Sequence, residues 1–71
     1  MKFTILFDRK ADGRWLADVP ERAGATGEGE TAWKAAANAQ AIVLRAIADE
    51  LEQLAVSPEH LVIEFEHAES E

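Results

Sequence analysis

The sequence has no cysteine, no tyrosine and only two prolines among its 71 residues. Without cysteine there can be no disulfide and no cysteine-ligated metal, so packing alone must hold the fold together, as is typical of proteins in a reducing compartment. The apolar start of the chain ends at Asp8, which is too early for a signal peptide or a membrane span. We therefore predict a cytoplasmic protein that does not associate with membranes.

Basic residues are also scarce, with 7 Lys and Arg against 14 Asp and Glu, and the net charge is −7. The field of such a chain repels polyanions, so we predict no direct binding to nucleic acid. A basic protein partner fits this charge better. The alternative interpretation is that the acidic balance serves only solubility.

Sequence motifs of catalysis and of cofactor binding are missing from the chain, which has no catalytic triad and no phosphate-binding loop. The glycines at 24, 27 and 29 depart from the G-x-G-x-x-G pattern, so we interpret this stretch as a flexible edge and loop. The spacing of His60 and His67 is not that of metal ligands, which favours structural or solvated histidines. We predict neither a cofactor nor a metal site.

Alternating polarity over residues 3–7 and 15–19 predicts two half-buried strands. A three-residue turn that ends at Gly13 keeps the large apolar residues of both strands on one face, because it pairs Phe7 with Ala17. Such a bulged turn requires its glycine at a positive φ. We therefore expect a hairpin with Gly13 in the left-handed region.

A single long helix is predicted over 32–54, with Thr31 as its N-cap. Apolar residues at three- and four-residue spacing form one stripe, which we expect to face the sheet. The stripe consists of Trp33, Ala37, Leu44, Ile47, Leu51 and Leu54, with Gln40 filling one slot. Trp33 is predicted to pack against Trp15 across the interface of helix and sheet. The many alanines raise helix propensity and let the helix lie close to the sheet.

The remaining strands complete an α+β fold. Residues 23–29 predict a weak edge strand, and alternation over 61–66, after a proline break, predicts the last strand. A meander followed by a right-handed helical crossover gives the order β-β-β-α-β, with a four-stranded sheet in the order 3-2-1-4 and the helix on one face. We assign residues 1–67 to this single domain and 68–71 to a short acidic tail.

Two surfaces are candidates for protein binding. The sheet face away from the predicted helix carries apolar residues among charges, and we predict that it mediates a homodimer. These apolar residues are Leu6, Leu16 and Val62. Acidic residues around the loop that leaves the second strand form a candidate patch for another protein, and their alternative role is that of solvated loop charges. They are Asp18, Glu21 and Glu28.

A metal-dependent nuclease is the enzymatic alternative, because a β-β-β-α-β order is similar to the front half of a ribonuclease H. Two-metal chemistry needs several oxygen ligands that converge on ions about 4 Å apart. Asp8 stands at the end of the first predicted strand, and the predicted helix has no carboxylate before Asp49. We therefore predict that the protein is not an enzyme and leaves RNA intact.

The run D-G-x-W-x-A-x-V-P, followed by G-x-x-x-x-G-x-T and an alanine-rich helix, resembles the N-terminal domain of HicB antitoxins, which inhibit HicA toxins that cleave mRNA. The matching positions are Asp12, Gly13, Trp15, Ala17, Val19, Pro20, Gly24, Gly29, Thr31, Ala35 and Ala39. The resemblance implies a HicB-like, partly ribonuclease-H-like fold. It also implies a partner, a small basic HicA-like toxin, that the protein inhibits sterically.

Some positions depart from the family pattern. Residues 21–24, Glu-Arg-Ala-Gly, stand where the family usually has a Leu-Pro-Gly-like step, and Lys34-Ala35 replaces the usual Glu-Ala. Family members continue into a DNA-binding domain, whereas this sequence ends at Glu71, so we expect a stand-alone domain without operator binding. The alternative function is that of an orphan dimeric interaction domain of HicB-like fold with no toxin partner.

Overall fold

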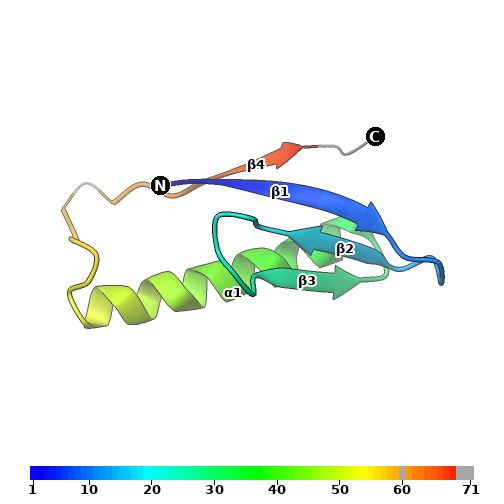
Figure 1. The fold of residues 1–71 in the computed structure, drawn as a ribbon. Coiled ribbons are helices and arrows are strands. Elements are labelled where there is room, and N and C mark those ends of the chain that lie inside the picture. The colour runs from blue at the N-terminus through cyan, green and yellow to red at the C-terminus, as the bar shows by residue number, and fades with distance from the viewer. Residues whose placement is uncertain (60, 69–71) are drawn as a thin grey trace.

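A computed structural model describes residues 1–59 and 61–68 and has an α+β fold (Figure 1). The predictions for His60 and for tail residues 69–71 lie outside the described residues. The sheet order is β3-β2-β1-β4, with β1 parallel to β4 and the other two pairs antiparallel. The predicted order 3-2-1-4 with a single helix is confirmed. The elements are β1 Lys2–Arg9, β2 Trp15–Asp18, β3 Thr26–Gly29, α1 Ala32–Glu52 and β4 Glu64–Ala68.

The hairpin between β1 and β2 has the predicted register, with Phe7 opposite Ala17. The amide of Lys10 donates to the carbonyl of Arg14 at 2.8 Å, and the amide of Gly13 donates to the carbonyl of Lys10 at 2.9 Å. Gly13 has a φ of +90°, a value that residues with a Cβ atom rarely adopt. The three-residue turn and the positive φ of Gly13 are therefore confirmed.

The strand β3 lies at the sheet edge as predicted, but its glycines are not a flexible stretch. Gly27 and Gly29 are buried under α1. A Cβ atom added to Gly27 would lie 2.5 Å from the carbonyl oxygen of Ala35 and closer still to the amide nitrogen of Ala39. These glycines are required because the backbone of α1 passes directly over them. The interpretation of a flexible edge is wrong at these two positions.

The helix α1 begins at the predicted cap, because the hydroxyl oxygen of Thr31 accepts a hydrogen bond from the amide of Lys34 at 3.1 Å. It ends at Glu52, two residues before the predicted end. Leu54 has a φ of +58°, which takes the chain out of the helical path. A single long helix is therefore confirmed, with a shorter C-terminal turn.

The buried face of α1 differs from the predicted stripe. The residues it buries are Ala35, Ala36, Ala39, Val43 and Ile47. Of the predicted stripe, Ile47 is buried as predicted and Leu51 packs partly buried against the core, whereas Trp33 is 78% exposed and Leu44 is 44% exposed. The reason is close packing: α1 lies directly on β3 and β2 (Figure 1), and over Gly27 the small residues Ala35 and Ala39 allow that approach.

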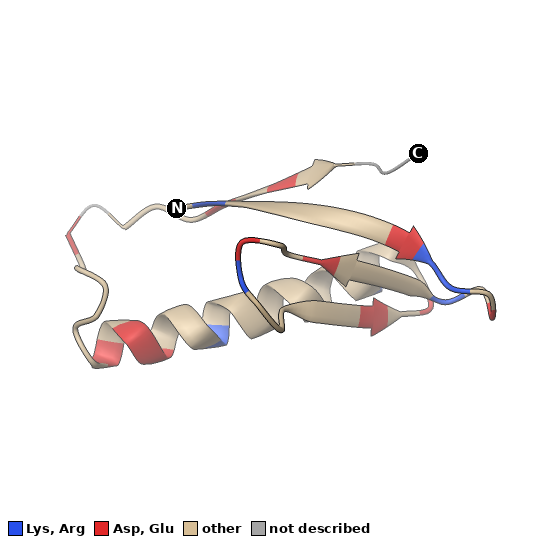
Figure 2. Cartoon of the chain, viewed as in Figure 1, with Lys and Arg blue, Asp and Glu red and all other residues tan. Residues whose placement is uncertain are grey.

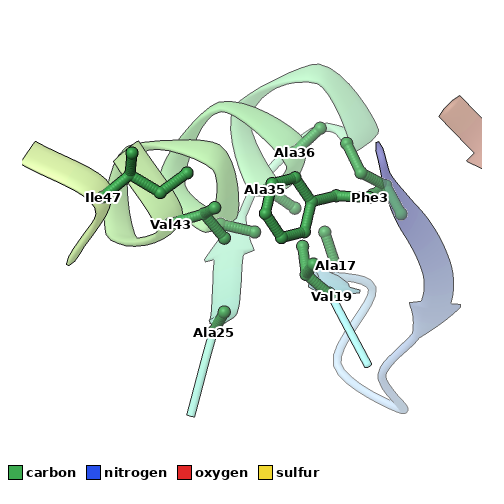
Figure 3. Close-up of a cluster of buried hydrophobic side chains, with 10 residues drawn as sticks. Phe3, Ala17, Val19, Ala25, Ala35, Ala36, Val43 and Ile47 are labelled. Carbon is green, nitrogen blue, oxygen red and sulfur yellow. The ribbon is translucent and has the colours of Figure 1, made fainter. Parts of the chain in front are cut away.

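The core lies between this alanine-rich face and the helix-facing side of the sheet (Figure 3). Phe3 and Ile5 from β1 are buried in it, together with Val19, which follows β2. The predicted contact between Trp15 and Trp33 is wrong. Trp15 instead packs edge-on against Phe7, with ring centroids 6.4 Å apart, whereas Trp33 is largely exposed and its ring lies beside that of His67 in β4.

The last strand begins later than predicted, at Glu64, and runs parallel to β1 as far as Ala68. Phe65 lies opposite Phe3 in β1, and their stacked rings are 5.4 Å apart. Ala68, which we assigned to the acidic tail, is therefore part of the sheet. The boundary predicted after residue 67 is one residue too early.

Candidate protein-binding face

The sheet face away from α1 is not covered by any other element of the described chain, and we call it the open face. Strand alternation assigns the even-numbered strand residues to it. The register agrees, because it pairs Leu6 with Asp18, Asp8 with Leu16, and Leu16 with Glu28. The side chain of Leu6 is 37% exposed there. The predicted placement of Leu6 and Leu16 on the uncovered face is confirmed.

A shallow hollow of about 470 Å³ lies on the open face, over β1, β2 and the first residue of β3. Across the β1–β2 pair, each leucine stands opposite an aspartate, so the two leucines lie on one diagonal and the two carboxylates on the other. The residues that line the hollow are Leu6, Phe7, Asp8, Leu16, Asp18 and Thr26. A surface of this kind offers apolar contact and negative charge side by side.

Val62 lies apart from this hollow. It precedes β4, it is 58% exposed, and its carbonyl oxygen accepts a hydrogen bond from the N-terminal amine of Met1. The register of β4 places Val62 beside the start of β1, six strand positions before Leu6, which is roughly 20 Å along the strand. The three residues predicted for self-association therefore do not form one patch.

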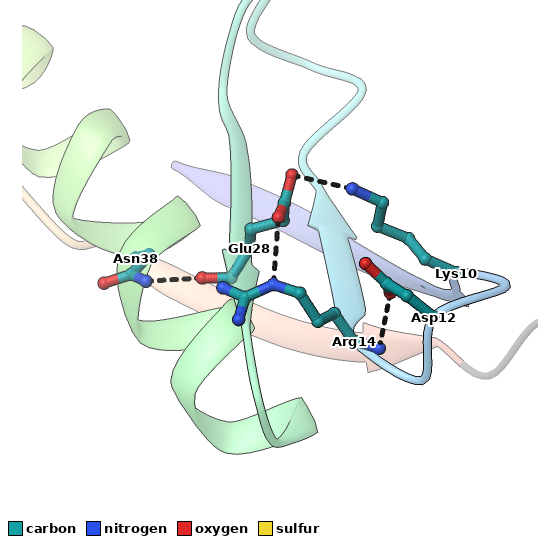
Figure 4. A network of polar contacts seen from close by, with 5 residues as sticks. All are labelled: Lys10, Asp12, Arg14, Glu28 and Asn38. Atoms are coloured by element: carbon teal, nitrogen blue, oxygen red, sulfur yellow. Dashed lines mark hydrogen bonds and ion pairs between the residues drawn. The ribbon is translucent and has the colours of Figure 1, made fainter.

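Glu28 lies within β3 rather than in the loop after β2, and its charge is compensated (Figure 4). Its carboxylate is 3.2 Å from Nζ of Lys10 and 3.1 Å from Nε of Arg14. The hydrogen bond from Lys10 and, to a smaller extent, the one from Arg14 lower the pKa of Glu28. Two cations around one carboxylate leave no net negative charge at this end of the predicted patch.

Glu21 lies in the loop after β2 and contacts β1. Its carboxylate accepts hydrogen bonds from the amide of Thr4 at 3.0 Å and from the hydroxyl of Thr4 at 2.8 Å, and the bond from the amide is the main reason for its lowered pKa. Because β2 ends at Asp18, opposite Leu6, Thr4 lies beyond the reach of β2. Glu21 therefore satisfies a backbone donor that the sheet leaves unpaired.

Of the predicted patch, only Asp18 lines the hollow, whereas Glu21 lies in the loop after β2 and contacts Thr4. Asp18 accepts a hydrogen bond from the hydroxyl of Thr26 at 3.0 Å and stays exposed. Asp8 lies on the same face as Asp18 and was not among the predicted patch residues. The signal was available, because the predicted hairpin register already places Asp8 opposite Leu16 on the open face.

The loop after β2 is also joined to the helix. Arg22 donates two hydrogen bonds to the carboxylate of Glu50 in α1, at 2.5 and 2.6 Å. This contact gives Glu50 a structural role among the acidic residues of the last helical turns (Figure 2), where negative charge opposes the helix dipole. It also fixes the loop that carries Glu21.

The Arg22→Gln variant should have a lower melting temperature than the wild type at neutral pH and a similar one in acid. Hydrogen bonds from Arg22 lower the pKa of Glu50 from its ordinary value of 4.5. A carboxylate whose pKa is lower in the folded state than in the unfolded state stabilises the protein at pH values above its unfolded-state pKa. This stabilisation is lost as the pH falls through its folded-state pKa.

Thermal unfolding of both proteins, from neutral pH to well below 4.5, measures this difference. The effect should be small, because the two side chains remain 27% and 30% exposed and solvent screens such pairs. A difference in melting temperature that stays constant over this pH range would show that Glu50 is not the group that Arg22 stabilises.

The described residues contain no group of three or more side chains placed to hold a metal ion. Asp8 lies on the open face, and α1 lies on the opposite face of the sheet, so the helix carboxylates cannot join Asp8 at one ion. Over residues 1–59 and 61–68, no helix has both the length and the apolar character needed to cross a membrane. The chain matches no family model, no curated protein and no solved structure.

Proposed function

We propose that this chain is a HicB-like antitoxin-type protein whose open face binds and sterically inhibits a small basic, RNA-cleaving HicA-like toxin. The observation that carries the proposal is the hollow in which Leu6 and Leu16 alternate with Asp8 and Asp18. The resemblance of the D-G-x-W-x-A-x-V-P run to HicB antitoxins supports the same function. The β-β-β-α-β order is also compatible with the partly ribonuclease-H-like fold that the resemblance implies.

Charge and apolar contact have separate roles in this proposal. A toxin that binds RNA presents a cationic surface, which a chain with a net charge of −7 attracts over long range. The carboxylates of Asp8 and Asp18 give the docked complex its orientation, while the leucines opposite them are buried on binding and supply much of the affinity. Glu21 adds negative charge at one edge, whereas the compensated Glu28 does not.

The test takes the small basic protein encoded nearest to this chain as the candidate toxin and measures rescue of growth when the two are co-expressed. The wild type should rescue growth, and the Asp8→Lys/Asp18→Lys variant should rescue it poorly. The matched control is Asp49→Lys/Glu52→Lys, which makes the same change in net charge at the far end of α1, where cations favour the helix dipole. This control should rescue growth like the wild type.

Equal rescue by both double variants would exclude the open face as the toxin-binding surface. A purified chain that retains no basic protein at low salt would exclude the inhibitor function and favour the orphan interaction domain. The same preparation should leave single- and double-stranded RNA intact with magnesium or manganese present. RNA cleavage that disappears in Asp8→Asn would instead favour the divergent nuclease.

A further inference from the structure

The two edges of the sheet differ in how far their backbone groups are used. At the β3 edge, the side-chain amide of Asn38 in α1 donates to the carbonyl oxygen of Glu28 at 2.6 Å. The amide of Thr26 donates to the carbonyl of Gly24 at 3.1 Å. The helix also packs on β3. An added strand would therefore find few free backbone groups at this edge.

The strand β4 forms the other edge, and no element of the described chain pairs with its outer side (Figure 1). Along a strand in a parallel pair, alternate residues bond to the neighbouring strand and the residues between them point away from it. The amide of Glu64 donates to the carbonyl of Met1 at 2.8 Å, so the even-numbered residues of β4 bond to β1. The backbone N–H and C=O groups of Phe65 and His67 therefore point outward.

The hydrogen bonds of β1 show the same alternation. The amide of Thr4 points toward the β2 side, because it donates to the carboxylate of Glu21 at 3.0 Å. The residues on either side of Thr4, Phe3 and Ile5, must then bond to β4. The register agrees, because it places Glu66 opposite Thr4 and so between these two residues. Outward groups such as those of β4 are a template for one more strand.

The side chains of β4 make the two sides of this edge chemically different. Glu64 and Glu66 are exposed on the open-face side. Glu66 lies 3.9 Å from Nζ of Lys2, but both side chains are more than 60% exposed, at 67% and 68%, so this ion pair is weak. On the helix-facing side, Phe65 is only partly buried. A strand beside β4 therefore meets negative charge on one side and an apolar ring on the other.

We propose that an extended segment of a basic protein partner adds a fifth strand to the sheet at β4. Its cations lie over Glu64 and Glu66, and its apolar residues, at alternate positions, cover Phe65. The source of the segment, the basic toxin, rests on the proposed function. The edge itself is separate from the hollow, because no residue of β4 lines the hollow.

A second copy of this chain is a poor choice for the added strand, because β4 carries like charges. When two β4 strands pair antiparallel over their full length, their Glu66 residues stand directly opposite each other. In the register centred on Phe65, Glu64 stands opposite Glu66. Like charges in these positions destabilise a strand pair and protect an edge from self-association. The same charges attract a basic segment.

The experiment titrates the purified, isotope-labelled chain with a synthetic peptide of alternating lysine and valine and follows amide hydrogen exchange by NMR. In the free chain, the amides of Phe65 and His67 should exchange faster than that of Glu66, which is bonded to β1. Saturating peptide should slow both outward amides by about 5–10-fold, as one net backbone hydrogen bond implies. The dissociation constant should rise with salt. Peptide that binds without slowing these two amides would overturn the proposal.

Charge reversal tests the selection of a basic segment. Glu64→Lys/Glu66→Lys changes two exposed side chains and should weaken peptide binding by about 10-fold or more. The matched control, Asp49→Lys/Glu52→Lys, makes the same change in net charge on α1 and should bind like the wild type. Equal weakening by the two double variants would show that the peptide responds only to net charge, and would overturn the proposal.

A backbone substitution tests strand pairing itself. His67→Pro removes one outward amide, at a position where an edge strand tolerates proline, and should weaken peptide binding by about 10-fold. His67→Gln keeps the amide and should bind the peptide much more tightly than His67→Pro. Equal weakening would show that the side chain binds, and would overturn the proposal. Slowing of the same amides by a higher protein concentration, without peptide, would assign the edge to a second copy instead.

Rescue of growth separates this inference from the inhibitor function. His67→Pro should rescue growth poorly in the presence of the toxin. If it rescues growth like the wild type while Asp8→Lys/Asp18→Lys does not, strand addition is wrong and the inhibitor function stands. If the peptide slows the outward amides of β4 but no basic protein is inhibited, strand addition stands and the inhibitor function is wrong.

Discussion

The Gly27→Ala variant is expected to lose about 3 kcal/mol of folding free energy. This is the upper end of the usual cost of adding a methyl group to a closely packed core. An alanine Cβ at this position would lie 2.5 Å from the carbonyl oxygen of Ala35. The atoms it meets belong to the helix backbone and cannot rotate away as a side chain would. The whole of α1 must therefore move off the sheet and open the core between them.

A core as small as this one rarely supplies more than about 3–5 kcal/mol, so Gly27→Ala should leave much of the chain unfolded at 37 °C. Urea denaturation followed by circular dichroism measures the loss. The matched control is Gly24→Ala, where a Cβ meets no atom within 4 Å but the φ is +84°; its cost should be only about 1–2 kcal/mol. Equal stability of the two variants would contradict the close approach of α1 to β3.

The second large effect is expected at Ile5, whose side chain is completely buried between the sheet and α1. Ile5→Ala removes methyl and methylene groups from a closely packed site and should cost about 2–5 kcal/mol. Leu6→Ala changes the neighbouring residue on the open face and should cost less than about 1 kcal/mol. The same denaturation experiment measures both variants.

This pair also separates folding from binding. Leu6→Ala should retain the stability of the wild type and still bind the proposed basic partner more weakly, because Leu6 lies in the hollow of the open face. Ile5→Ala should lose binding only to the extent that it unfolds. Similar destabilisation by both substitutions would contradict the assignment of the two faces of β1.

Strand order, the hairpin and the helix start were predictable because each depends on local patterns. The alternation of polar and apolar residues fixes which side chains share a face, and a three-residue turn at Gly13 is the one that keeps Phe7 opposite Ala17. Thr31 marks the N-cap through its own side chain. The right-handed crossover then leaves few places for the last strand.

The buried face of α1 could not be predicted in the same way, because the helix has two neighbouring apolar sides. Hydrophobicity favours the side with Trp33 and Leu44, which the structure leaves exposed. The sheet selects the alanine side, since Gly27 and Gly29 bring the helix backbone so near that larger side chains do not fit. The distance between two elements depends on residues that are far apart in the sequence.

The same distinction applies to the candidate site. Alternation placed Leu6 and Leu16 on the uncovered face, among charged residues. Which acidic residues remain uncompensated depends on contacts between elements: Glu28 of β3 is held by Lys10 and Arg14 from the turn between β1 and β2, and Asp8 and Asp18 are left to line the hollow. Strand periodicity assigns a residue to a face, but its charge is compensated only by the neighbours that folding brings to it.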